Sequence, residues 1–220
     1  MDVPIVDTLE HYEKLIEESN DPVHDSKLMQ EYMSRWDGAE FFRALGSCID
    51  KKVLEVGVGT GRLAKIILDK GCKYFTGIDL SPNTVLRAKT NLNRFENCDL
   101  FVEDIEQYQK PSYFDVAYSV LTFMHISNKE LALRNMVTSI CKGGHIVLSI
   151  SSNEEEWLDF GNRRVKLYIV SIDEYQKYLE SMGCVVEPPI ELIDTFDKGM
   201  SSKSQGKKVA TLIKATKVID

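Results

Sequence analysis

The stretch VLEVGVGTGRLA, residues 53–64, constrains the fold of this chain more than any other part of the sequence. It begins with small aliphatic side chains, as a strand does when both of its faces are covered, and passes through three glycines at alternate positions into a helical pattern. Glycine lets the backbone turn sharply and lets a ligand approach it closely. In open α/β sheets, ligands bind at the carboxyl ends of the strands, usually at the first strand-to-helix turn. The stretch therefore predicts both a fold class and a binding region.

Strands and helices alternate beyond this turn. We expect strands at 53–56, 74–78, 100–102, 114–120 and 145–150, and helices at 62–70, 82–94 and 128–141. Several helix ends have recognisable signals: Ser81-Pro82 is an N-cap followed by proline, and Gly71 and Gly143-Gly144 are stop signals. Because the strands are near-continuous apolar runs, the sequence predicts an α/β fold with a doubly wound, mostly parallel sheet covered by helices on both faces.

Both ends of the chain add elements to this sheet. We expect two helices between residues 7 and 42, a polar irregular segment at 151–164, a helix from the capping box Ser171-x-x-Glu174 to about Gly183, and an antiparallel edge hairpin from the apolar runs 185–193 and 208–217. The complete sheet then has seven strands.

The charge balance opposes a nucleic-acid partner. The 220 residues include 27 Lys plus Arg and 34 Asp plus Glu, which gives a net charge of −7, and 43% are apolar, enough to bury one core of ordinary size. A negative surface repels a phosphate backbone. We therefore expect no binding to nucleic acid.

The cysteines and the N-terminus favour a soluble cytoplasmic protein. The five cysteines are scattered without a C-x-x-C pair, so neither a disulfide framework nor a thiolate metal site is expected, and we predict no metal. The N-terminal stretch has acids where a signal peptide has basic residues, and no apolar run approaches the ~20 residues that cross a bilayer. No membrane partner is expected.

Glu55 is unusual because it is an acid inside an apolar strand. An unpaired buried charge costs several kcal/mol, so this carboxylate needs a hydrogen-bonding partner. Backbone amides of the turn and the ammonium group of a ligand are the two candidates. The spacing Gly57-x-Gly59-x-Gly61 differs from the G-x-G-x-x-G of dinucleotide dehydrogenases, and the stretch does not match the phosphate loop G-x-x-x-x-G-K-[ST].

Two further acids follow the next two strands. Asp79 ends the second strand, 20 positions after Gly59, where a carboxylate can accept hydrogen bonds from both ribose hydroxyls of an adenosine. The alternative is a helix-capping role, although Ser81 already provides the cap. Asp104 follows the third strand, where it could accept from an adenine amino group while Ile105 covers the ring; the alternative is an exposed acid in a polar turn.

Taken together, these motifs resemble the class I S-adenosylmethionine-dependent methyltransferases. The likeness spans residues 50–150 and includes the stretches FDVAYSVLTFMHI (114–126) and LRNMVTSICKGGHIVLSI (133–150). The later helix and hairpin agree with the antiparallel seventh strand of that family. The resemblance implies one Rossmann-like domain, made of an N-terminal helical cap (1–48), a cofactor-binding half (49–150), and a substrate-side loop, helix and hairpin (151–220).

The resemblance also implies the cofactor contacts. The cofactor would be S-adenosylmethionine and the product S-adenosylhomocysteine. The methionine part would be surrounded by Glu55, Gly57, Gly59 and Gly61, the ribose bound by Asp79, the adenine contacted by Leu80, Asp104 and Ile105, and the sulfonium underlain by Ser119 and Val120. Because the methyl group is already activated by positive sulfur, the protein mainly aligns the reactants and removes a proton where the nucleophile has one.

His125 is the first candidate for this proton transfer. It comes just after the fourth strand, and an unperturbed imidazole pKa near 6.5 suits proton removal. The alternative is a packed, hydrogen-bonded histidine without a catalytic role. Tyr118, Thr122 and Tyr12 are weaker candidates.

The expected acceptor is a small molecule with an oxygen or nitrogen nucleophile. Residues 119–122, Ser-Val-Leu-Thr, lack the Asn/Asp-Pro-Pro-aromatic motif of enzymes that methylate exocyclic amines of bases, and the chain has no Pro-Cys pair for attack on cytosine carbon 5. The acidic segment 153–160 could favour a cationic acceptor or could be a solvated loop. The alternative function is a cofactor-binding regulatory or partner module without turnover, and a monomer or homodimer is expected.

Overall fold

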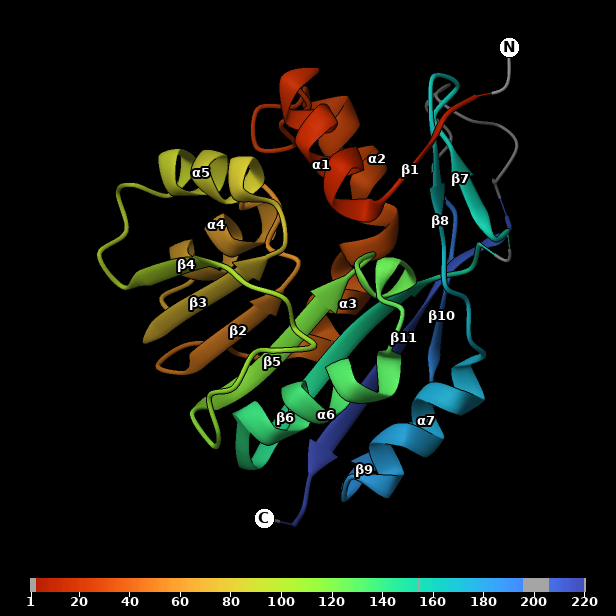
Figure 1. Ribbon diagram of the computed structural model, residues 1–220. Coiled ribbons are helices and arrows are strands. Elements are labelled where there is room, and N and C mark those ends of the chain that lie inside the picture. The colour runs from red at the N-terminus through yellow and green to blue at the C-terminus, as the bar shows by residue number, and fades with distance from the viewer. Residues whose placement is uncertain (1–2, 154, 196–205, 220) are drawn as a thin grey trace.

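A central β-sheet is the largest element of the computed structural model, which describes residues 3–153, 155–195 and 206–219 (Figure 1). Within these residues the sheet consists of β2 (Lys52–Val56), β3 (Tyr74–Asp79), β4 (Cys98–Val102), β5 (Phe114–Val120), β6 (Ile140–Ser151), β9 (Cys184–Val186), β10 (Ile190–Ile193) and β11 (Lys208–Lys217). The strand order is β10-β11-β6-β5-β2-β3-β4, and β9 also pairs with β11.

The pairing of the strands confirms the predicted fold class. Strands β2 to β6 pair in parallel, whereas β11 pairs antiparallel with β6, β9 and β10. Since β9 and β10 share the position beside β11, the strands fill seven positions, as the sequence predicts. The chain order reverses between β2 and β5, and ligands bind at such switch points in open α/β sheets.

Helices cover both faces of the sheet (Figure 1). One face packs against α3 (Ala39–Leu45), α4 (Arg62–Asp69) and α5 (Pro82–Asn91), and the other against α6 (Lys129–Ser139) and α7 (Ile172–Ser181). Because side chains alternate along a strand, β2 contributes Val53 to the first core and Leu54 to the second. Among the described helices, none combines the length and the apolar character needed to span a membrane.

Local sequence signals set several helix ends. Ser81 caps α5 with its side chain, and Pro82 is the first residue of that helix. Ser171 and Glu174 form the predicted capping box at the start of α7. Gly71, with φ +87°, directly follows the C-cap of α4 in the left-handed conformation that glycine tolerates.

The junction between α6 and β6 differs from the prediction. The helix ends at Ser139, and β6 begins directly at Ile140 and continues through Gly143-Gly144, which the sequence suggests as a helix stop. The reason is a close approach between strands, since a Cβ on Gly144 would stand 2.8 Å from the carbonyl oxygen of Asp115 in β5. The register of β5 with β6 is also irregular at this place. Gly144 therefore serves strand packing.

An N-terminal cap lies at the carboxyl ends of the parallel strands (Figure 1). The sequence predicts two helices there, but the chain forms three, α1 (Thr8–Glu17), α2 (Lys27–Asp37) and α3, because Gly38 interrupts the helical path between α2 and α3. The cap places α1 over the ends of the strands.

A second, small sheet stands beside α1 and is not predicted by the sequence. It consists of β1 (Ile5–Val6), β8 (Arg164–Lys166) and β7 (Trp157–Asp159), in the order β1-β8-β7. Val6 lies opposite Val165 in a parallel pairing, whereas β7 and β8 are antiparallel. Most of residues 151–164 are still outside regular structure, but these short strands join the segment after β6 to the N-terminus.

Candidate cofactor and active site

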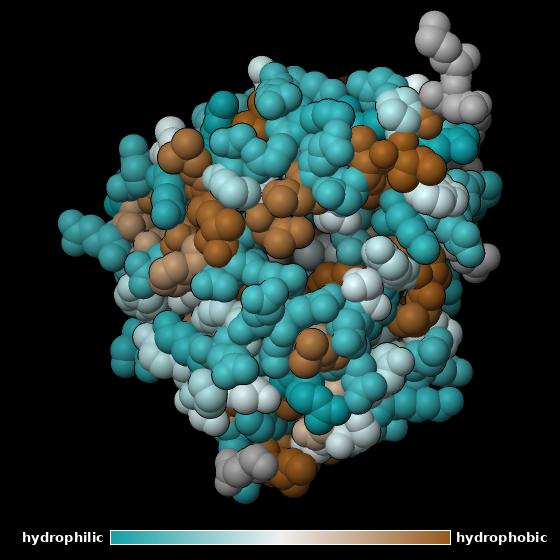
Figure 2. Space-filling model, in the orientation of Figure 1, coloured by the Kyte–Doolittle hydropathy of each residue, from teal (hydrophilic) through white to brown (hydrophobic). Residues whose placement is uncertain are grey.

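A cavity of about 670 Å³ opens at the carboxyl ends of the central strands, beneath α1. Figure 2 shows apolar side chains gathered around the hollow on this face. The volume is in the range of small-molecule pockets. Most residues predicted for the site line the cavity: Glu55, Gly57, Gly59, Asp79, Leu80, Asp104, Ile105, Val120 and His125. Gly61 and Ser119 do not line it.

Glu55 has a hydrogen-bonding partner that the sequence did not indicate. Tyr118, directly opposite Glu55 in the pairing of β2 with β5, donates its hydroxyl to Glu55 Oε2 at 2.8 Å. Burial raises the pKa of Glu55 well above its usual range, while the Tyr118 hydrogen bond and the charge of Arg62 oppose this rise. A cation placed in the cavity would favour the ionised carboxylate further. Because Tyr118 is fully buried and its hydroxyl is engaged, it is not a base for the reaction.

The three glycines of the first turn have different roles. All three have positive φ, but a Cβ on Gly57 would overlap the side chain of Thr122, and one on Gly61 would stand 2.9 Å from Leu92. At Gly59 a Cβ would meet nothing within 4 Å, because this glycine faces the open cavity. Gly57 and Gly61 thus permit protein packing, whereas Gly59 leaves backbone accessible to a ligand.

Asp79 is held at the end of β3 by two backbone amides. Gly59 N donates to Oδ2 at 2.9 Å, and Ser81 N donates to Oδ1 at 3.0 Å. Burial raises the pKa of Asp79, and these backbone hydrogen bonds oppose the rise. Each carboxylate oxygen can accept more than one hydrogen bond, so the side chain can also accept from two neighbouring hydroxyl groups.

The next part of the cavity wall combines apolar and acidic side chains. Ile105 is buried and Leu80 is partly exposed, and both line the cavity. Asp104 Oδ1 accepts a hydrogen bond from Glu106 N at 2.9 Å, which fixes the turn that follows β4. All three residues line the cavity.

The end of β5 turns sharply into the cavity. Ser119 Oγ donates to the Val56 carbonyl at 2.8 Å, so its side chain is held within the sheet and does not line the cavity, whereas Val120 does. Leu121, which also lines the cavity, has φ +55°, a conformation that costs a non-glycine residue about 1–3 kcal/mol. This turn brings Leu121 and Thr122 into the wall of the cavity.

His125 ends the short 3-10 helix η1 (Phe123–His125) and lines the cavity. The side chain is 8% exposed, and neither ring nitrogen has a hydrogen-bond partner among the described residues. Burial lowers the pKa of His125 to about 4, so the ring is neutral at pH 7. The Tyr12 ring of α1 lies edge-on at 5.4 Å between centroids. The alternative considered from the sequence, a packed histidine held by hydrogen bonds, therefore does not match His125 among the described residues.

Known methyltransferases are similar to this chain in sequence and in fold. A family model described as a methyltransferase domain matches residues 54–148. This match and the similar proteins support a class I S-adenosylmethionine-dependent methyltransferase. As a structure, the N-methyltransferase NodS from Bradyrhizobium japonicum, solved with S-adenosylhomocysteine, is similar with a TM-score of 0.68 at 19% identity, covering 96% of this chain and 99% of that one.

Two curated methyltransferases are similar in sequence to this chain. Malonyl-acyl-carrier-protein O-methyltransferase 2 of Ilyobacter polytropus is 33% identical over 98 residues, which are 44% of this chain and 38% of the relative. The ubiquinone biosynthesis O-methyltransferase of Yersinia enterocolitica is 29% identical over 117 residues, 51% of this chain and 48% of the relative. The chain thus spans less than half the length of either curated relative.

S-adenosylmethionine is the cofactor of this methyltransferase domain, and the cavity fits it. Gly59 leaves the backbone open, Asp79 offers acceptor oxygens, and Glu55 offers an acid for an ammonium group. The described residues contain no group of three or more His, Cys, Asp or Glu side chains that could hold a metal ion. The contacts of individual side chains with parts of the cofactor are proposals, and binding measurements test them.

Asp79→Ala is expected to weaken S-adenosylhomocysteine binding by about 1–3 kcal/mol, because the ribose role that the resemblance implies for Asp79 would be lost with its carboxylate. Titration calorimetry measures the change, and circular dichroism verifies that the variant is folded. Asp69→Ala, which removes an exposed acid of α4 far from the cavity, is the matched control and should bind as the wild type does. An unchanged dissociation constant for Asp79→Ala would remove the ribose role.

Proposed function

We propose that this protein transfers the methyl group of S-adenosylmethionine to an oxygen or nitrogen atom of a small molecule. The observation that supports this most is the continuity of one cavity, which extends from Glu55 and Asp79 to the buried, unpartnered ring of His125. The carboxylates of Glu55 and Asp79 suit cofactor binding. The ring of His125, which follows β5, suits contact with the nucleophile of the methyl acceptor.

The residues of the chain would hold and orient the reactants. When bound, the cofactor supplies a methyl group activated for in-line displacement by a positively charged sulfur. Glu55 would bind the amino group of its methionine part and Asp79 the ribose hydroxyls, while Leu80, Asp104 and Ile105 would enclose the adenine. Val120 and Leu121 would border the reacting atoms and exclude water. Alignment of this kind can account for a large part of the rate acceleration.

His125 would accept the proton of the nucleophile. Its ring is neutral above pH 4 or so, as the lowered pKa implies, and both nitrogens are free of protein partners in the described structure. A ring this weakly basic does not ionise a resting alcohol or amine. As the new bond to carbon forms, however, the nucleophile becomes far more acidic, and a positioned weak base then suffices.

Several observations favour a small-molecule acceptor. The curated relatives are named for O-methylation of a malonyl acyl-carrier protein and in ubiquinone biosynthesis. The net charge of −7 opposes nucleic acid, as does the sequence Ser-Val-Leu-Thr at the end of β5. The cytoplasmic location and the oligomeric state, a monomer or homodimer, stay predictions.

Turnover distinguishes this function from a binding module. The protein should form S-adenosylhomocysteine from S-adenosylmethionine in the presence of a panel of small alcohols, phenols, carboxylates and amines, as followed by chromatography. Heat on titration with the cofactor, without product from any acceptor of a broad panel, would instead favour the module without turnover.

His125→Asn is expected to lower kcat about 100-fold with an accepted substrate while the affinity for S-adenosylhomocysteine stays the same, as for loss of a proton acceptor. His24→Asn is the matched control, because His24 lies on an exposed loop of the cap and does not line the cavity. Initial rates and titrations measure the two effects. Wild-type turnover in His125→Asn would reduce His125 to a packing role.

A further inference from the structure

His11 of α1 lines the cavity, and its hydrogen bonding fixes the position of its ring proton. The side chain is 1% exposed, and Nδ1 lies 2.9 Å from Nε of Arg163. An arginine Nε always carries a hydrogen, so Nδ1 must accept, and the proton of the neutral ring sits on Nε2. Burial and the adjacent guanidinium lower the pKa of His11 to about 4, so the ring is neutral at pH 7. His11 is therefore a fixed N–H donor.

Arg163 is itself held in place by α1. Its Nη1 and Nη2 donate to the two carboxylate oxygens of Glu18 at 2.5 and 2.8 Å, in the two-pronged geometry that suits a guanidinium. The Phe160 ring packs against His11 at 4.4 Å between centroids, and the Tyr12 ring at 5.1 Å. Glu18 and Arg163 thus orient His11 across the junction of α1 and the small sheet, and no described group accepts from Nε2.

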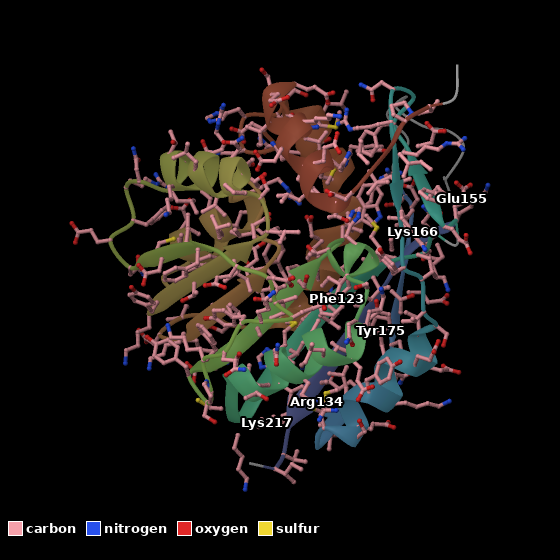
Figure 3. The ribbon with its side chains drawn as sticks, viewed as in Figure 1. Phe123, Arg134, Glu155, Lys166, Tyr175 and Lys217 are labelled. Atoms are coloured by element: carbon pink, nitrogen blue, oxygen red, sulfur yellow. The ribbon has the colours of Figure 1, made fainter. Side chains whose placement is uncertain are left out.

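Lys166 adds a positive charge to the same end of the cavity. It lies on β8 (Figure 3) and lines the cavity, and its Nζ is 5.4 Å from the centroid of the Tyr168 ring. In the described part of the chain no carboxylate pairs with it. Two acids that line this region accept hydrogen bonds from backbone amides, Asp7 from Glu10 N at 2.8 Å and Glu106 from Asn128 N at 3.1 Å.

His11 Nε2–H and Lys166 Nζ are thus two donors for which the described residues offer no acceptor. We propose that the methyl acceptor bears a carboxylate, which is bound by the Nε2–H of His11 and the ammonium of Lys166. The apolar part of the acceptor packs against Leu158, Phe160 and Tyr168, which line the cavity. Hydrogen bonds from a cation to a carboxylate are among the strongest that proteins make.

The acidic segment 153–160 does not oppose an anionic acceptor. Of its described residues, Leu158 and Phe160 line the cavity, and the acids do not. The segment thus contributes apolar side chains, and none of its described acids, to the cavity wall. This inference rests on the proposed function, because it places the carboxylate in the cavity assigned to methyl transfer.

A matched set of ligands tests the charge preference. Benzoate, benzamide and benzylamine share one ring and differ in charge, and each is titrated by ligand-observed NMR into the wild-type complex with S-adenosylhomocysteine. Benzoate should bind at least tenfold more tightly than benzylamine, with benzamide between them. Lys166→Met should remove this preference, whereas Lys177→Met, which removes an exposed lysine of α7, should retain it.

The state of His11 is measured independently of activity. In ¹⁵N-resolved NMR spectra of the imidazole groups, His11 should be protonated on Nε2 alone at pH 7, and Arg163→Met should mix its two tautomers. His11→Phe, which keeps a ring in place, should weaken benzoate binding about tenfold without changing the affinity for S-adenosylhomocysteine.

Failure of this inference and failure of the proposed function give different results. A wild-type protein that does not bind S-adenosylhomocysteine contradicts the proposed function. A protein that binds it, yet prefers benzylamine, binds none of the three ligands, or has His11 protonated on Nδ1, overturns the carboxylate assignment alone.

Discussion

Gly57→Ala is expected to lower the free energy of unfolding by about 2–5 kcal/mol. The backbone at Gly57 has φ +78°, where a side chain is strained, and the new Cβ would overlap Thr122 at the end of β5. Urea denaturation measures the loss. A double variant, Gly57→Ala with Thr122→Gly, should recover the part that comes from the overlap and keep the backbone strain. A Gly57→Ala protein as stable as the wild type would contradict this packing role.

Gly59→Ala is the contrasting variant in the same turn. With φ +55° and no atom within 4 Å of the new Cβ, it should cost only about 1 kcal/mol of stability. The added methyl group points into the cavity, so cofactor affinity should fall more than stability does. In this turn, Gly57→Ala should therefore affect mainly stability, and Gly59→Ala mainly cofactor affinity.

Protonation of His125 alone is expected to lower the free energy of unfolding by about 3 kcal/mol as the pH drops from 7 to 4. Its pKa is about 4 in the folded protein and 6.5 in the unfolded chain. Between these values the unfolded chain binds a proton that the folded protein does not, so lowering the pH favours unfolding. The effect begins below pH 6.5 and is complete below pH 4. His11, whose pKa is also lowered to about 4, acts in the same direction.

The difference between wild type and His125→Asn isolates this contribution, because other titrating groups act on both proteins. Urea denaturation at several pH values should show a weaker pH dependence in His125→Asn than in the wild type. His24→Asn removes an exposed histidine and should follow the wild-type curve. Identical slopes for His125→Asn and the wild type would mean that His125 is not buried in the neutral form.

Local signals in the sequence predict much of the fold, and longer-range contacts explain the differences. The N-cap Ser81, the capping box at Ser171 and the apolar strands depend on neighbouring residues, and the structure agrees with each. The early start of β6 depends on how closely Gly144 approaches Asp115 in another strand. The small sheet depends on pairing Val6 with Val165, which no local pattern reveals.

In the candidate site, too, the sequence indicates some contacts and not others. The spacing of Asp79 from Gly59 is visible in the sequence because one strand and one helix fix their relative positions, and the hydrogen bond between them agrees. The bond of Tyr118 to Glu55 joins residues 63 positions apart, and that of Arg163 to His11 joins residues 152 apart. Such partners are set by strand register and by the closing of the cap, so neither a motif nor a spacing indicates them.

Titration calorimetry of the wild-type protein with S-adenosylmethionine, and separately with NADH, tests the central claim most directly. A cavity built on Glu55, Gly59 and Asp79 should bind one molecule of S-adenosylmethionine per chain and give no heat with NADH. Binding of NADH without binding of S-adenosylmethionine would contradict the account.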